Sequence, residues 1–144
     1  MKVFIGSDHG GYDLKGSLIT SLMERGFDIV DRGTNSKKSC DYPDFSFAVA
    51  EDVRTNPGSF GVLVCTTGVG ASMCANKVKG IRAALCINKD QAIMSRRHND
   101  ANVIVFGAKY TSPEEALEMF MAWVNEPFEG GRHQRRVDKI NERG

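Results

Sequence analysis

Five short apolar runs alternate with longer amphipathic segments, and this alternation restricts the fold more than any other feature of the chain. The runs are rich in Val, Ile and Phe and nearly continuous in hydrophobic character, which is typical of strands covered on both faces of a parallel sheet. They are Lys2–Gly6, Phe27–Asp31, Gly61–Cys65, Arg82–Ile87 and Asn102–Phe106. Because strands that alternate with helices form such sheets, we predict a three-layer, doubly wound α/β sandwich of the Rossmann or flavodoxin-like type.

Helical patterns fill the segments between these strands. The clearest one begins at Ser112, where Pro113 at the first helical position and Glu115 at the third complete a capping box. The helical patterns cover residues 12–26, 44–56, 72–80, 89–98 and 112–125, and a weaker one covers residues 130–144. No repeat, linker or low-complexity tract interrupts them. We therefore predict a single domain over residues 1–144, which ends in a C-terminal helical tail.

The expected strand order indicates where a ligand would bind. Five-stranded doubly wound sheets commonly run in the order 2-1-3-4-5, and their ligands bind beyond the carboxyl ends of the first and third strands, where the order reverses. The loops at these two ends are SDHGG at residues 7–11, which contains Asp8 and His9, and CTTGVGAS at residues 65–72. We expect them to face each other across a pocket.

Composition excludes several classes of function. The net charge of +1 argues against general binding to nucleic acid or to a membrane surface. No apolar stretch approaches the roughly 20 residues of a membrane span, and the N-terminal run has no signal-peptide pattern. The four cysteines form no C-x-x-C pair, so we expect a cytoplasmic protein without a structural disulfide or zinc site.

The glycine loop at residues 65–72 does not match the common nucleotide-binding motifs. G-x-G-x-x-G is not completed after Gly68 and Gly70, because residue 73 is Met, and the lysine of a Walker A motif is absent. A tight turn between a strand and a helix is an alternative interpretation that needs no ligand.

The position of Cys65 indicates a chemical role for this loop. It ends a buried strand and precedes successive backbone N–H groups, which lead into a helix and form an electropositive nest. A thiol at the edge of such a nest is favoured in its thiolate form. The same amides can hold an oxyanion as it forms. Cys65 is thus a candidate base or nucleophile, with a buried, inert cysteine as the alternative.

Two further groups of polar residues stand out in the second half of the chain. His98 and Asn99 belong to the run RRHNDAN, which directly precedes a buried strand, although a solvated turn would give the same pattern. Arg132 and Arg136 are four residues apart and therefore share one helical face. Such a pair can bind a phosphate monoester, or it can simply be a solvated surface.

Six motifs occur in an order and at spacings that resemble those of one enzyme family. They are SDHGG at residue 7, DYPD at 41, C-T-TGVG at 65, ANKVKGIRAAL at 75, RRHNDANV at 96 and FEGGRHQRR at 128. Together they resemble the type B ribose-5-phosphate isomerases, whose wider family includes galactose-6-phosphate isomerase subunits and allose-6-phosphate isomerases. The resemblance extends from residue 6 to about residue 140.

The resemblance implies a catalytic role for three residues. Cys65 corresponds to the base that moves a proton between C2 and C1 of the sugar, and His98 to the histidine that opens the sugar ring. Thr67 belongs to the anion-holding loop, and we count it with the catalytic residues. The remaining loop residues implied to contact the substrate are Thr66, Gly68, Val69, Gly70 and Ser72. Thr66 departs from the family, in which glycine usually follows the cysteine.

The resemblance also implies the other substrate contacts. The sugar ring oxygen or its hydroxyls would be contacted by Asp8, Tyr42 and Asn99, and the phosphate by His9, Arg132 and Arg136. Lys109 occupies the position of a further family arginine, so the positive charge is kept but the bidentate fork is lost.

The implied reaction interconverts D-ribose 5-phosphate and D-ribulose 5-phosphate through a cis-enediolate, as in the pentose phosphate pathway. It needs no metal and no cofactor. A six-carbon sugar phosphate is an alternative substrate, and a non-catalytic sugar-phosphate-binding subunit is an alternative function. The joint presence of Cys65, His98 and Asn99 speaks against the second alternative, because a binding protein needs no base.

Assembly follows from the expected strand order. That order places the last strand at the sheet edge farthest from the first strand, so the tail with Arg132 and Arg136 would have to pass the covering helices to reach its own pocket. A two-fold partner offers a simpler route. We therefore expect a homodimer, or a tetramer built from it, in which each tail closes the pocket of the other subunit. The resemblance implies shared sites as well.

Overall fold

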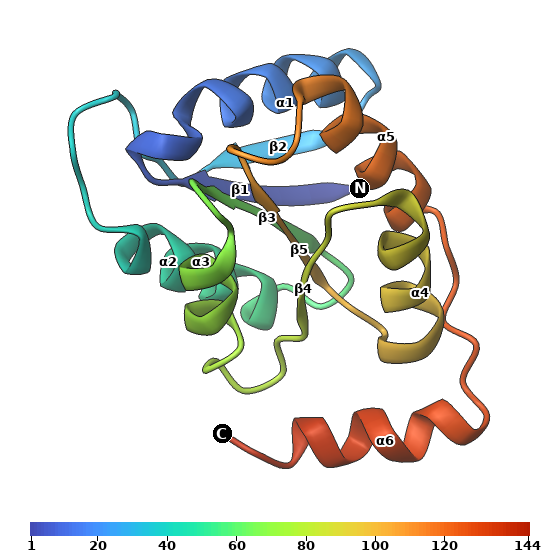
Figure 1. Ribbon diagram of the computed structural model, residues 1–144. Coiled ribbons are helices and arrows are strands. Elements are labelled where there is room, and N and C mark those ends of the chain that lie inside the picture. Colours follow the sequence, from blue (N-terminus) through green and yellow to red (C-terminus); the bar gives the residue numbers. More distant parts are fainter.

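One parallel sheet of five strands forms the centre of this computed structural model, which describes residues 1–144 (Figure 1). The strands are β1 (Lys2–Ser7), β2 (Asp28–Asp31), β3 (Phe60–Cys65), β4 (Ala83–Leu85) and β5 (Val103–Gly107). All five predicted strands are confirmed, and their ends differ from the prediction by no more than two residues. The predicted class, a three-layer α/β sandwich, is confirmed as well.

Helices cover both faces of the sheet. The helices α1 (Tyr12–Glu24), α4 (Lys89–Asn99) and α5 (Pro113–Val124) pack on one face, and α2 (Tyr42–Thr55) and α3 (Val69–Ala75) on the other. A short 3₁₀ helix, η1 (His9–Gly11), precedes α1. The last helix, α6 (Arg132–Asn141), lies beyond the sheet and near α4 (Figure 1). No helix has the length and apolar character that crossing a membrane requires.

The core is divided by the sheet into two hydrophobic clusters. The larger cluster joins α1 and α5 to the strands through residues such as Leu18, Phe120 and Trp123. The smaller cluster lies under α2 and α3 and includes Val49 and Cys65. The capping box predicted at the start of α5 is present: Ser112 accepts from the N–H of Glu115, and the Glu115 carboxylate accepts from the N–H of Ser112.

The predicted strand order 2-1-3-4-5 is wrong, because the sheet runs β2-β1-β3-β5-β4. β5 lies between β3 and β4, with Val103 paired to both Gly61 and Ala83. The crossover through α3 skips one strand position, and the crossover through α4 on the opposite face returns to fill it, an arrangement that keeps both connections right-handed. All residues of β5 are buried, whereas those of the three-residue strand β4 are half-buried. The short strand therefore forms the edge of the sheet.

Candidate active site

A pocket of about 440 Å³ opens beyond the carboxyl ends of β1 and β3. The two predicted loops line it together, as expected at a position where strand order reverses. Its lining residues are Asp8, Tyr42, Cys65, Thr66, Thr67, Val69, Gly70 and Met73. Of these, only Met73 had no role in the sequence prediction. Met73 follows Val69 by four positions and so shares its helical face. This spacing in the sequence could have indicated that Met73 lines the pocket.

Cys65 is the last residue of β3 and is only 4% exposed. Its Sγ atom accepts a hydrogen bond from the N–H of Gly68 at 3.1 Å. Gly68 has a φ of 81°, and a Cβ atom there would overlap the side chain of Leu85. Only glycine suits that backbone conformation and that space, so the turn that directs an N–H group at the sulfur depends on Gly68.

The loop after Cys65 supplies further N–H groups to the pocket. The first N–H groups of α3 have no acceptor within their own helix. The N–H of Val69 donates to Thr67 Oγ1 at 3.3 Å. The ring of Tyr42 lies against Gly70, where a Cβ atom would overlap it. The backbone of this loop therefore forms a positively polarised wall, suited to negative charge that develops on a bound oxygen.

Asp8 and His9 are held at the end of β1 by different contacts. The Asp8 side chain is buried, and its Oδ1 atom accepts from the N–H of Gly11 at 3.1 Å, which caps η1. His9 is exposed, and its Nδ1 atom accepts from the N–H of Cys40 at 3.2 Å. Because Nδ1 is an acceptor there, the neutral ring carries its proton on Nε2 and presents that atom as a donor.

An ion pair between the buried Lys15 and the exposed Asp31 anchors the segment that brings Cys40 and Tyr42 to the pocket. The ammonium group of Lys15 donates to Asp31 Oδ1 and to the carbonyl of Thr34, both at 2.7 Å. Ser7 at the end of β1 exchanges backbone hydrogen bonds with Gly33 and Thr34. The chain after β2 is therefore tied to the carboxyl end of β1.

Three residues predicted to contact the substrate, Thr66, Lys109 and Ser72, lie at or near the pocket, but not all of their side chains face it. The side chain of Thr66 is exposed and lies over Gly10, where a Cβ atom would overlap its hydroxyl. Lys109 follows β5, and its N–H donates to the Thr66 carbonyl at 2.9 Å, so it belongs to the same edge. Ser72 is turned back onto its own helix, with its hydroxyl donating to the Val69 carbonyl at 2.7 Å.

His98 and Asn99 do not lie in this pocket within one chain. They end α4, which leads into the start of β5. Val103 pairs with Gly61, four residues before Cys65. At about 3.3 Å per strand residue, the two ends of the sheet are separated by ~13 Å. The chain therefore places Cys65 at the carboxyl end of the sheet and His98 toward the amino end.

Arg132 and Arg136 lie on α6, and this helix is placed beside α4 and away from the carboxyl end of β3 (Figure 1). The expected path of the tail was wrong in one respect, because it does not leave from an edge strand: β5 is interior, and β4 forms the edge. The arginines are separated from the pocket along the direction of the strands rather than across the sheet from strand to strand.

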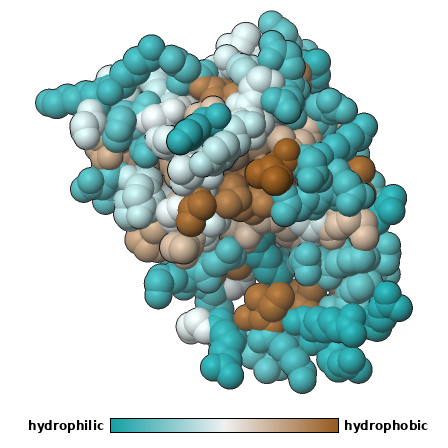
Figure 2. All heavy atoms as spheres, in the orientation of Figure 1, coloured by the Kyte–Doolittle hydropathy of each residue, from teal (hydrophilic) through white to brown (hydrophobic).

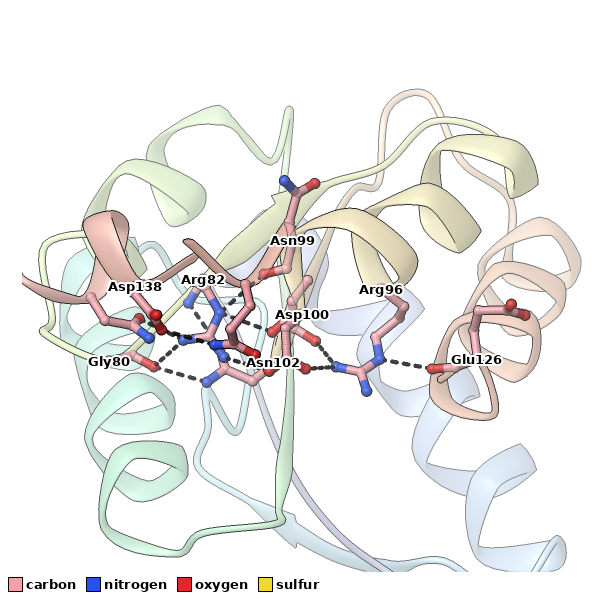
Figure 3. Close-up of polar contacts among 11 residues, drawn as sticks. Gly80, Arg82, Arg96, Asn99, Asp100, Asn102, Glu126 and Asp138 are labelled. Atoms are coloured by element: carbon pink, nitrogen blue, oxygen red, sulfur yellow. Dashed lines mark hydrogen bonds and ion pairs between the residues drawn. The ribbon is translucent and has the colours of Figure 1, made fainter. Parts of the chain in front are cut away.

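A network of charged groups fixes the region where α4 ends (Figure 3). Arg82 and Arg96 both approach the Asp100 carboxylate, at 3.5 and 2.9 Å, and Arg82 also donates to Asn141 of α6 at 2.8 Å. Asn99 joins through its backbone carbonyl, which accepts from Arg82, whereas its side-chain amide points away from the network. The amide of Asn99 thus remains free to contact a ligand.

Sequence reasoning gave no role to His133 and Glu129, which surround His98. The rings of His98 and His133 are stacked, with centroids 4.2 Å apart and planes inclined by 14°. Ligand atoms of the two histidines and Glu129 lie within 4.8 Å of one another. Stacked rings direct their nitrogen lone pairs side by side, whereas a shared metal ion needs them to converge. The arrangement is therefore better suited to ring packing than to a metal centre.

The other cysteines differ from Cys65 in their surroundings. Burial raises the pKa of the Cys86 thiol to about 12, so this thiol is inert at neutral pH. Burial, and then the proximity of Cys65, raise the pKa of Cys74 on α3. Cys65 is the one cysteine that lines the pocket.

Comparison with known proteins gives a consistent result. Residues 3–140 match the family model described as Ribose/Galactose Isomerase. The ribose-5-phosphate isomerase B of Escherichia coli (strain K12) is 43% identical over 139 residues, which cover 96% of this chain and 93% of the relative.

Solved structures agree over nearly the whole chain. The ribose-5-phosphate isomerase B of Clostridium thermocellum is 48% identical with a TM-score of 0.96, covering 99% of this chain and 96% of that one. The enzyme of Mycoplasma genitalium, solved with bound ribulose-5-phosphate, is 42% identical with a TM-score of 0.94, covering 98% and 94%. The chain therefore belongs to the ribose/galactose isomerase family.

Proposed function

We propose that this protein is an aldose–ketose isomerase that interconverts D-ribose 5-phosphate and D-ribulose 5-phosphate. The observation that carries the proposal is the position of Cys65, whose sulfur lies in a small pocket and accepts from the N–H of Gly68 at 3.1 Å. The thiolate is the form of a cysteine that can act as a base, and the N–H of Gly68 is placed to donate to that sulfur. The named relatives, one of them with bound ribulose-5-phosphate, support this choice of substrate.

The reaction moves one proton between neighbouring carbons. The Cys65 thiolate removes the proton from C2 of the open-chain aldose, the C2 electrons form a C1–C2 double bond, and negative charge collects on O1. Backbone N–H groups of the loop that ends at Gly70 stabilise that charge. A proton passes from O2 to O1, the Cys65 thiol returns its proton to C1, and the ketose results. A positioned base supplies a factor of about 10²–10⁴, and each oxyanion donor about 10²–10³.

Ring opening must come before proton transfer, because ribose 5-phosphate is mostly a closed five-membered ring. In our proposal His98 delivers the proton to the ring oxygen. His98 and Cys65 lie toward opposite ends of one sheet, so this role requires the His98 of a second chain. We propose a two-fold homodimer in which Arg132 and Arg136 bind the phosphate in the pocket of the partner.

The surface beside the pocket supports such an assembly. Val69 and Met73 of α3 and Ile140 of α6 are exposed hydrophobic residues. A groove of about 810 Å³ between α3, β4 and α6 is lined by apolar residues that include Val78, Ile81 and Ile140. Figure 2 shows hydrophobic atoms exposed over the middle of this face and again near α6. A second copy of the chain would cover this surface and bring its own α4 and α6 toward the pocket.

The test is turnover of three sugar phosphates, those of ribose, allose and galactose, combined with proton NMR in D₂O. We expect ribose 5-phosphate to give the highest kcat/KM and to lose its C2 proton signal by exchange. Higher turnover of a six-carbon substrate would contradict the choice of pentose. Binding without any C2 exchange would contradict catalysis altogether and would leave the binding-subunit alternative.

A further inference from the structure

The helix α6 contains a buried histidine that the proposed reaction does not use. His133 and Val137 are the buried residues of α6, and His133 is 7% exposed. Its ring lies flat against that of His98, whose side chain is 34% exposed. A residue of α6 thus forms one wall of the space in which the His98 ring can turn.

The charged groups around this pair come from α4, α6 and the segment between α5 and α6. Glu129 Oε1 lies 3.5 Å from His133 Nε2 and 3.9 Å from His98 Nε2. On α6, Arg132 and Arg136 are close enough to affect the titration of His133. On α4, the Arg97 side chain is paired with Glu126. Glu129 is therefore the carboxylate that faces both rings.

Burial lowers the pKa of His133, and the nearby His98 and Arg132 lower it further. The lowered pKa favours the neutral form of the His133 ring at neutral pH. A neutral aromatic ring remains a favourable stacking partner when the ring against it carries a positive charge. The stack can consequently persist through a cycle in which the other histidine gains and loses a proton.

We propose that His133 is a positioning residue: by stacking on His98 it fixes the plane of that imidazole for proton delivery to the sugar ring oxygen in the partner's pocket. The inference rests on the proposed function. Proton transfer requires hydrogen-bond distance between the donor and the acceptor, and a displacement of about 1 Å can cost about 10²-fold in rate. A partly exposed histidine in the last turn of a helix has two free side-chain torsions, and the stack removes that freedom.

The experiment compares two variants on two substrates. His133→Gln removes the flat ring but keeps a polar side chain, and His133→Phe restores a flat ring. Ribose 5-phosphate closes into a ring through its O4 hydroxyl, whereas erythrose 4-phosphate cannot, because its O4 atom carries the phosphate. For His133→Gln we expect kcat/KM to fall about 10–100-fold on the cyclic sugar and to change less than about threefold on the acyclic one, with most of the loss recovered in His133→Phe.

Two outcomes would overturn the inference. Equal losses on both substrates would assign His133 a general structural role, and unchanged turnover of ribose 5-phosphate would assign it none. If the unsubstituted protein turned over neither sugar, the proposed function itself would be contradicted.

The stack itself is measured separately from turnover. The chain has three histidines, so their imidazole signals can be resolved by ¹H–¹⁵N NMR. Loss of the ring current in His133→Gln should shift the His98 ring protons and leave those of His9 unchanged. Unchanged His98 signals would overturn the inference even if the enzyme were inactive.

Discussion

The two ends of the sheet differ in how they are built. At the carboxyl end, the pocket consists of buried strand ends, the 4% exposed Cys65 and the backbone of a glycine loop. At the amino end, Arg132 and Arg136 are exposed side chains of α6, and the half-buried His98 of α4 stacks on His133 of α6. The first end can stabilise charge at a fixed point, whereas the second carries long cationic groups suited to a mobile phosphate. Neither end has all the groups that the reaction needs.

The largest effect should come from the carboxyl end. Cys65→Ser removes the proposed base while leaving the loop in place, so we expect kcat to fall by about 10³-fold or more with little change in KM. Steady-state kinetics on ribose 5-phosphate measures both constants. Cys74→Ser is the matched control, because Cys74 is half-buried on α3 nearby but does not line the pocket, and it should be nearly as active as the wild type. Near-normal turnover by Cys65→Ser would remove it as the base.

The arginines at the amino end should affect KM rather than kcat. Arg136→Ala removes the proposed charge-assisted contact to phosphate; a contact of this kind is worth about 1.5–3 kcal/mol, which corresponds to a rise in KM of about 10–100-fold. Arg135→Ala is the control, because it removes an exposed cation of the same helix from a different face. The same loss in both variants would mean that only the overall charge of α6 matters.

A smaller effect should distinguish disruption of the loop after Cys65 from the cost of backbone strain alone. Gly68→Ala and Gly26→Ala both place a side chain at a φ near 85°, but only at Gly68 would the new Cβ meet another residue, Leu85. Left-handed backbone costs about 1–2 kcal/mol in each variant. We expect Gly68→Ala to lower Tm more than Gly26→Ala and to lower kcat as well, measured by thermal unfolding and kinetics. Equal Tm values and normal kcat in both would contradict the role of the tight loop.

The sequence was sufficient where the determinants are local. Alternating apolar runs indicated all five strands, and Ser112 with Glu115 indicated the start of α5, because caps and buried strands depend on neighbouring residues. The position of the pocket was also predictable, since the reversal between β1 and β3 does not depend on the order of the remaining strands.

The parts that failed depend on distant packing. Whether β4 or β5 forms the edge is decided by which strand is buried on both sides, and the AAL of β4 is less apolar than the VIVF of β5. His133 was missed because nothing in its sequence neighbourhood distinguishes a histidine stacked on another ring from a solvated one. The separation of His98 from Cys65 follows from the direction of α4, which ends at the amino end of β5. The sequence pattern indicates that direction, but the distance between the two residues is known only once the register of β5 against β3 is known.

The central claim is that the two ends of the sheet act together only across a dimer. Mixing Cys65→Ser chains with Arg136→Ala chains tests it most directly. In a mixed dimer with shared sites, one site has an intact Cys65 from one chain and an intact Arg136 from the other, while the second site has both lesions. After statistical exchange, about a quarter of all sites should be intact, and activity at low substrate concentration should rise well above that of either variant alone.

The measurement is the initial rate at a substrate concentration below KM, before and after subunit exchange, with mass spectrometry to establish that mixed dimers have formed. The account predicts recovery to about a quarter of the wild-type rate. Mixed dimers whose rate equals the average of the two parent variants would contradict it, because each active site would then be built from one chain.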